Sequence, residues 1–80
     1  MTGATERSLR DFIQGRTRAA VADDTDLFAS GLVSSLFALE LLVHVEQSFA
    51  VAVDGSDLTL DNFRTVEAMA ALIRRLQAVP

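Results

Sequence analysis

Hydrophobic positions near the N-terminus repeat at helical spacing. Leu9, Phe12 and Ile13 lie three and four residues apart, so they would form one apolar stripe along a helix. We expect this helix to begin near Thr5, whose hydroxyl can cap the following turn. Two pairs of opposite charges four residues apart fall on its outer face: Glu6 with Arg10, and Arg7 with Asp11.

The apolar pattern fades at Gly15, and a long connection rich in Ala and Asp follows, as far as Gly31. A connection of about 15 residues is longer than usual in a compact domain, so the chain must hold it in place. Four hydrophobic residues can pin this connection onto the core: Leu27, Phe28, Leu32 and Val33.

The most apolar stretch predicts a second helix over residues 35–49, with Ser34 as its N-cap. At 100° per residue, one side of this helix forms the expected core face: Ala38, Leu41, Leu42, Val45 and Phe49. The opposite side is polar: Glu40, His44, Gln47 and Ser48. Between the two sides, on the edge that also holds Ser35, lie four further residues: Leu36, Leu39, Val43 and Glu46.

This apolar arc is wider than a surface helix needs, and Phe37 falls within the polar side. Two explanations stay open. Either a small bundle surrounds the helix and buries both sides, including Leu36 and Leu39, or Phe37, Val43 and part of Leu39 stay exposed as a docking surface for other proteins.

The C-terminal part of the chain predicts one short and one long helix. Asp54 and Gly55 signal a turn, after which Asp57 would cap a single helical turn over residues 58–62. The last helix would run from residues 64–65 to about Ala78, with a core face of Val66, Met69, Ala70, Ile73 and Leu76. The predicted fold is therefore all-α: three main helices and one short helix, with no sheet, in a single domain over residues 1–80.

Composition narrows the possible functions of these 80 residues. The chain has no Cys and a single histidine, His44, so disulfides, thiolate metal sites and multi-histidine sites are excluded. A net charge of −4 argues against nucleic acid as a partner. No stretch reaches the roughly 18 apolar residues of a membrane span, and the first residues lack the apolar core of a signal peptide. We therefore expect a soluble, cytoplasmic protein that does not bind membranes.

Serines 30, 34 and 35 are the candidate reactive groups, but the sequence provides no catalytic partner for them. His44 stands nine residues beyond Ser35, about 180° away on the same helix, which excludes a local hydrolase triad. The acidic run at residues 23–26 lacks the glycine and distal glutamate of a calcium loop. We predict no catalytic residue and no metal site. A serine at the first turn of a helix is instead a good place for a phosphate group, because unpaired N–H groups and the helix dipole stabilise the anion.

The tripeptide Ser34-Ser35-Leu36 opens the second predicted helix, within an ordered set of further matches. These are residues 26–28 and 30–32 before it, and residues 40–42, 46–49 and 63–67 after it. The set covers nearly the whole chain and resembles the acyl carrier protein family, in which Asp-Ser-Leu occupies the tripeptide's place.

The resemblance implies that Ser35 carries 4′-phosphopantetheine, attached from coenzyme A, and holds an acyl group on it as a thioester. The carrier itself would be a monomeric helical bundle without catalytic activity. Its partners would be a phosphopantetheinyl transferase and the enzymes that load and process the acyl group. The docking residues that the resemblance and the helix pattern imply are Leu36, Phe37, Leu39, Glu40, Val43 and Glu46.

Two departures from the family pattern affect this interpretation. Ser34 replaces the expected aspartate, which removes a negative charge beside the phosphate and, by the resemblance, a group that helps the transferase hold its metal. The second helix also has few acids. We therefore predict that partners recognise it through apolar contact, with Phe37 and Val43, and that salt affects this recognition little.

Residues 35–39 and 62–67 resemble freestanding carriers of specialised metabolism, especially those that hold glycerol-derived polyketide extender units. This favours a discrete carrier of a polyketide pathway. Two alternatives stay open: a discrete aminoacyl carrier, such as a D-alanyl carrier, or peptidyl carrier, and an unmodified helical domain that only binds a partner.

Overall fold

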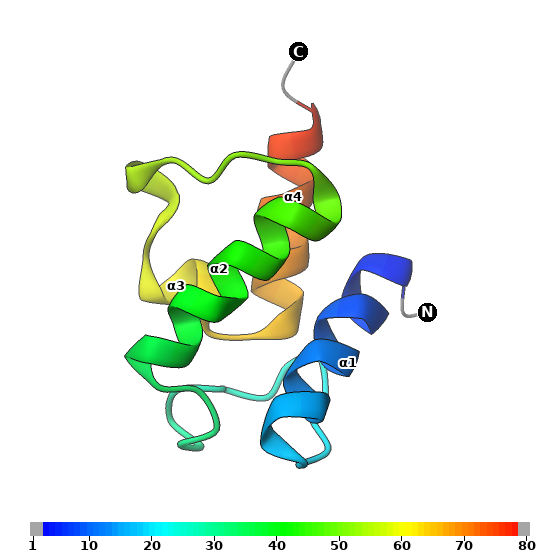
Figure 1. Cartoon of the computed structure of the whole chain (residues 1–80), viewed down its shortest axis with the longest axis vertical. Coiled ribbons are helices and arrows are strands. Elements are labelled where there is room, and N and C mark those ends of the chain that lie inside the picture. The colour runs from blue at the N-terminus through cyan, green and yellow to red at the C-terminus, as the bar shows by residue number, and fades with distance from the viewer. Residues whose placement is uncertain (1–2, 79–80) are drawn as a thin grey trace.

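The computed structural model describes residues 3–78 as an all-helical globule (Figure 1). Its elements are α1 (Ala4–Thr17), α2 (Ser35–Phe49), a 3-10 turn η1 (Gly55–Asp57), the short α3 (Leu60–Phe63) and α4 (Val66–Ala78). No strand occurs within the described range, so the predicted all-α class is confirmed. None of the helices in this range has the length and apolar character needed to cross a membrane.

The long helices and the loop between α1 and α2 enclose one hydrophobic core. The predicted core residues of α4 from Val66 to Ile73 are buried, as are Leu41 and Val45 of α2. The other predicted core residues of α2 and α4 are partly buried and pack against this cluster: Ala38, Leu42, Phe49 and Leu76. The periodicity of the sequence therefore placed these residues on the inward faces correctly, but it missed Leu72 of α4, which is also buried.

α1 differs from its prediction at both ends. It begins at Ala4 with Gly3 as N-cap and no side-chain cap, so the predicted capping role of Thr5 is wrong. The Gly3 carbonyl accepts from the Arg7 N–H at 3.1 Å, which starts the helix earlier. The helix also continues past Gly15 and ends at Arg18, a left-handed residue whose N–H bonds the Gln14 carbonyl at 2.8 Å.

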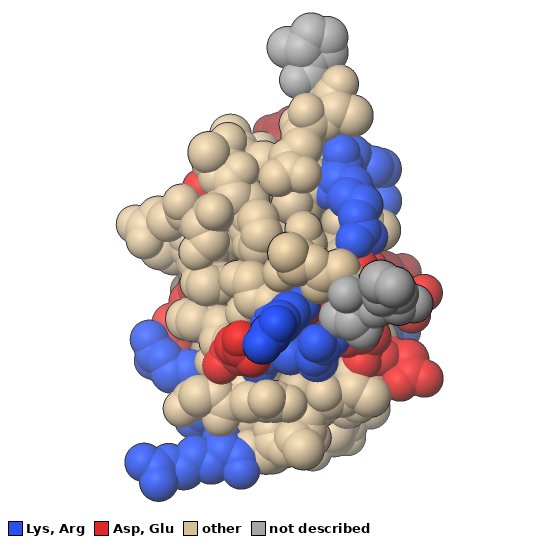
Figure 2. Space-filling view, turned by 90° about the vertical axis from the view of Figure 1, so that its right-hand side faces the viewer, with Lys and Arg blue, Asp and Glu red and all other residues tan. Residues whose placement is uncertain are grey.

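The charges of α1 pair with other segments. Arg74 of α4 donates to Glu6 at 2.6 Å, and Arg10 bonds Asp23 in the loop. The expected pair of Glu6 with Arg10 is therefore replaced by contacts across the fold, because α4 and the loop cover that side of α1. Figure 2 shows the corresponding side of the molecule, with arginine and acidic side chains interspersed on it.

The connection between α1 and α2 is fixed to the core, as its hydrophobic residues predict. Leu27 is fully buried, and Val33 is nearly so. Backbone hydrogen bonds tie the loop to the start of α4: the Leu27 N–H donates to the Arg64 carbonyl at 2.8 Å, and the Glu67 N–H donates to the Asp23 carbonyl at 2.9 Å. The Val33 N–H in turn donates to the Leu27 carbonyl at 3.0 Å, which connects the residue before Ser34 to this anchored part of the loop.

The predicted cap of the short helix is wrong. Asp57 belongs to the 3-10 turn, where its Oδ2 accepts from the Asp54 N–H at 3.3 Å. Thr59 caps α3 instead, with its hydroxyl oxygen accepting from the Asn62 N–H at 3.2 Å. Several cap-forming residues follow one another here, and the two closely spaced turns each use a different one.

Candidate functional site

Ser34 and Ser35 have different environments at the start of α2. Ser34 is extended (φ −91°, ψ 172°), and its Oγ accepts from the Phe37 N–H at 3.2 Å. Its carbonyl accepts from the Ala38 N–H at 2.9 Å. Ser34 is therefore the N-cap, as predicted, and both of its acceptor groups are occupied by the helix.

Ser35 is the first residue of α2 and is exposed to solvent. No hydrogen bond engages its hydroxyl among residues 3–78. The first turn of α2 contains no acidic residue, so nothing there repels a phosphate group. An accessible hydroxyl beside the positive end of a helix dipole suits a serine that accepts a phosphate ester.

His44 contacts α1 and lies apart from Ser35. Its ring stacks on Phe12 with a centroid distance of 4.1 Å and an interplanar angle of 14°. Nδ1 lies 3.2 Å from the Ser48 Oγ, and the buried Nε2 has no partner among the described residues. Burial lowers the pKa of His44 below its ordinary value. The one histidine of the chain is thus a packing residue of the α1–α2 contact.

Comparison with known families identifies this arrangement. The model of the phosphopantetheine attachment site family matches residues 7–73. The chain is 35% identical over 54 residues to D-alanyl carrier proteins of Streptococcus pyogenes serotypes M5 (strain Manfredo), M49 (strain NZ131) and M1, which covers 68% of each chain. The chain belongs to the phosphopantetheine-binding carrier family. Members of this family are non-catalytic carriers.

The outer side of α2 in this carrier is apolar. Leu36 is 74% exposed, Leu39 59% and Val43 48%, so the part of the docking hypothesis that needs these three side chains in solvent is consistent with the structure. Sequence reasoning missed Leu58 and Leu60, which are also exposed. These five residues form what we call the outer apolar face.

A small hollow of about 190 Å³ separates α2 from the α3 region within this face. Leu39, Leu58 and Leu60 line it, together with residues of the core. Leu58 and Leu60 stand on either side of Thr59, the cap of α3. A helix this short gives the residues beside its cap little core to pack against, so their position in the sequence could have indicated that they are exposed.

Phe37 corrects one sequence expectation. It is only 9% exposed, and its ring centroid lies 5.9 Å from that of Phe12. The helical wheel placed Phe37 on the polar side of α2, but α1 covers that side. Its predicted exposure is therefore wrong, and a direct contact with partners through Phe37 is not supported.

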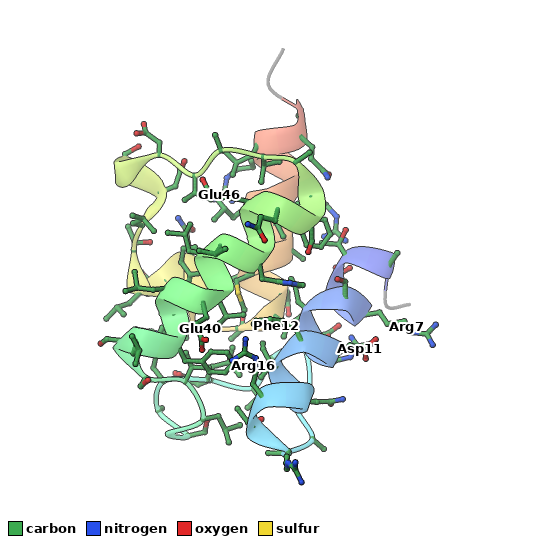
Figure 3. The ribbon with its side chains drawn as sticks, viewed as in Figure 1. Arg7, Asp11, Phe12, Arg16, Glu40 and Glu46 are labelled. Carbon is green, nitrogen blue, oxygen red and sulfur yellow. The ribbon has the colours of Figure 1, made fainter. Side chains whose placement is uncertain are left out.

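Both acidic side chains of α2 accept hydrogen bonds from other residues of the protein. Glu40 accepts from Arg16 Nη1 at 3.0 Å, on the α1 side (Figure 3). Glu46 Oε2 accepts from the Val53 N–H at 2.9 Å and holds the segment that follows α2. The described residues also contain no cluster of three or more potential metal ligands.

Proposed function

We propose that Ser35 carries 4′-phosphopantetheine, transferred from coenzyme A, and that the protein presents an acyl group on this arm to partner enzymes. The observation that supports Ser35 over its neighbour is the use of the two hydroxyls. The Ser34 oxygen caps α2, whereas the Ser35 hydroxyl is exposed and free of hydrogen bonds among the described residues. In this proposal the N–H groups of the first turn of α2 stabilise the attached phosphate.

Intact-protein mass spectrometry after incubation with a phosphopantetheinyl transferase and coenzyme A tests this proposal. We expect the wild type and Ser34→Ala to gain the mass of one phosphopantetheine, and Ser35→Ala to gain none. Gain by Ser35→Ala together with loss in Ser34→Ala would show that Ser34 is the attachment residue. No gain in any of the three, also in protein from the native host, would favour the unmodified interaction domain.

Partner enzymes dock, in our proposal, on the outer apolar face. Leu36, Leu39 and Val43 contribute apolar area next to Ser35, and Glu40 and Glu46 lie at its edges with internal partners. Recognition then depends mainly on apolar contact and less on charge than it would for a carrier with many free acids on this helix. We propose that the protein works as a cytoplasmic monomer with its transferase, loading and processing enzymes.

Two kinds of acyl group are candidates for the cargo. The resemblance of residues 35–39 and 62–67 to carriers of specialised metabolism supports a polyketide pathway with a glycerol-derived extender unit. The 35% identity to D-alanyl carrier proteins supports an aminoacyl cargo instead. Mass spectrometry of the acyl group on protein from the native host separates them, because only the aminoacyl group adds a nitrogen. The genes beside this one would point the same way: extender-unit dehydrogenases or an aminoacyl ligase.

A further inference from the structure

A polar hollow lies on the α1 side of the attachment site. It has a volume of about 470 Å³ and lies between the end of α1, the loop and the first turns of α2. Ser34 lines it together with Arg16 and Glu40, and Ser35 is the next residue along the chain. Among the described residues that line this hollow, Arg16 carries the only positive charge.

Arg16 extends into the hollow from the last turn of α1. Its Nη1 donates to Glu40 at 3.0 Å, and its guanidinium lies 5.3 Å from the centroid of the Phe12 ring. Figure 3 shows Arg16 and Glu40 directed toward one another between α1 and α2. The two side chains are 53% and 45% exposed, so water screens their attraction and the ion pair is weak. A better anion within reach would displace Glu40.

The phosphodiester on Ser35 would be such an anion. Arg16 and Ser34 line the same hollow, and Ser35 follows Ser34 at the start of α2, so a rotamer change of the long arginine side chain toward this end of the helix would bring its guanidinium toward a phosphodiester on Ser35. A guanidinium can donate two parallel N–H bonds to a phosphate, in a planar geometry that suits arginine especially well. No acid in the first turn of α2 competes for Arg16.

We propose that Arg16 exchanges Glu40 for the phosphodiester when Ser35 is modified. Arg16 is then a positioning residue, which fixes the root of the arm against the α1 side of α2 and leaves the rest of the arm free. The exchange also releases the Glu40 carboxylate beside the outer apolar face. Partner enzymes would thus meet a different charge pattern on the unmodified and the modified protein. This inference rests on the proposed attachment at Ser35 and adds a response of the protein to it.

Nuclear magnetic resonance of the unmodified and modified proteins tests the exchange directly. We expect the guanidinium N–H signals of Arg16 to shift on modification and to show a correlation with phosphorus across the new hydrogen bond. The signals of Arg7, on the same helix but far from the hollow, serve as the control and should not move. Unchanged Arg16 signals in protein whose mass shows the arm on Ser35 would overturn the inference alone. Absence of the arm from Ser35 would contradict the proposed function as well.

Thermal unfolding gives an independent measurement. We expect modification to raise the Tm of the wild type by about 2–6 °C. Arg7→Gln, which removes the same charge from α1, should keep this rise, and Arg16→Gln should reduce it to the part that the N–H groups of the first turn of α2 provide. Each variant is compared with its own unmodified form, so loss of the Arg16–Glu40 pair itself cancels. Glu40→Gln frees Arg16 in advance and should enlarge the rise. An equal rise in Arg16→Gln and Arg7→Gln would overturn the inference.

Discussion

The two sides of α2 outside the core differ in what holds their side chains. On the side toward α1, Phe37 is buried, His44 stacks on Phe12, and Glu40 is paired with Arg16. On the outer side, Leu36 and Leu39 extend into solvent without such contacts. The difference shows that the hydrophobic residues toward α1 contribute to packing of the fold, whereas those on the outer side are exposed, as the proposed docking surface requires.

Truncation of Phe37 should have the largest effect on this comparison. Phe37→Ala removes a buried ring that contacts Phe12, so we expect it to lower the free energy of unfolding by about 3 kcal/mol. Leu36→Ala, the adjacent residue on the outer side, should change this free energy by less than about 0.5 kcal/mol. Urea unfolding of both variants measures the difference. Similar stabilities would mean that the two sides are not distinct.

Leu39→Ala tests whether the outer side of α2 docks partner enzymes. We expect this variant to remain as stable as Leu36→Ala while its turnover by a partner enzyme falls about tenfold, because apolar contact area is lost at the docking surface. Raising the salt concentration from 0.05 to 0.5 M, by contrast, should change the turnover of the wild type less than about twofold. A steep salt dependence, with Leu39→Ala active as wild type, would contradict apolar docking.

Ser34 is the N-cap of α2, the point from which both the outer side and the α1 side of the helix start. Ser34→Ala removes the side-chain cap of α2 and should lower the free energy of unfolding by about 1 kcal/mol, while Ser34→Asp should restore it because aspartate caps equally well. Ser34→Asp also reinstates the acid that the family pattern expects. If the aspartate variant is modified faster by the transferase at unchanged stability, the departure at this position affects the transferase and not the helix.

His44 gives the α1 side a weak dependence on pH, the smallest effect of the four. Burial lowers the pKa of folded His44, so the unfolded chain binds more protons at mildly acidic pH. Stability from neutral His44 is complete above its unfolded pKa of about 6.5 and falls as the pH drops through the lower folded pKa. Melting curves between pH 8 and 5 should show a decline in the wild type that His44→Phe reduces. An identical decline in both would exclude His44 as its source.

The melting curves stop at pH 5 so that the titration of Glu6 does not contribute to the decline. A hydrogen bond from Arg74 lowers the pKa of Glu6, which therefore contributes stability above its ordinary pKa of 4.5 and loses it only in more acidic solution. Arg7, Asp11, Arg16 and Glu40 line the hollows around His44. The part of the decline above pH 5 that His44→Phe removes is thus assigned to the histidine.

The sequence predicted the bounds of α2 and its cap because both depend on nearby residues. The apolar periodicity defines the helix, and Ser34 occupies its end. The exposure of Phe37 was not predictable in this way, since it depends on where α1 lies in the fold. Choice of Thr59 over Asp57 as the cap of α3 also escaped prediction, because both residues can cap and only the three-dimensional path of the chain selects one. The partner of Glu40, Arg16, comes from a distant segment for the same reason.

The hydrogen bonds that join the loop before Ser34 to the start of α4 have a consequence for synthesis of the protein. The segment leading into the serine is fixed by Arg64 and Glu67, which the ribosome adds well after Ser35. Until those residues have emerged, Leu27 and Asp23 lack their backbone partners, and the start of α2 has no fixed position. A transferase that requires the folded surface must therefore wait for nearly the whole chain, which makes attachment of the arm a late step that follows folding.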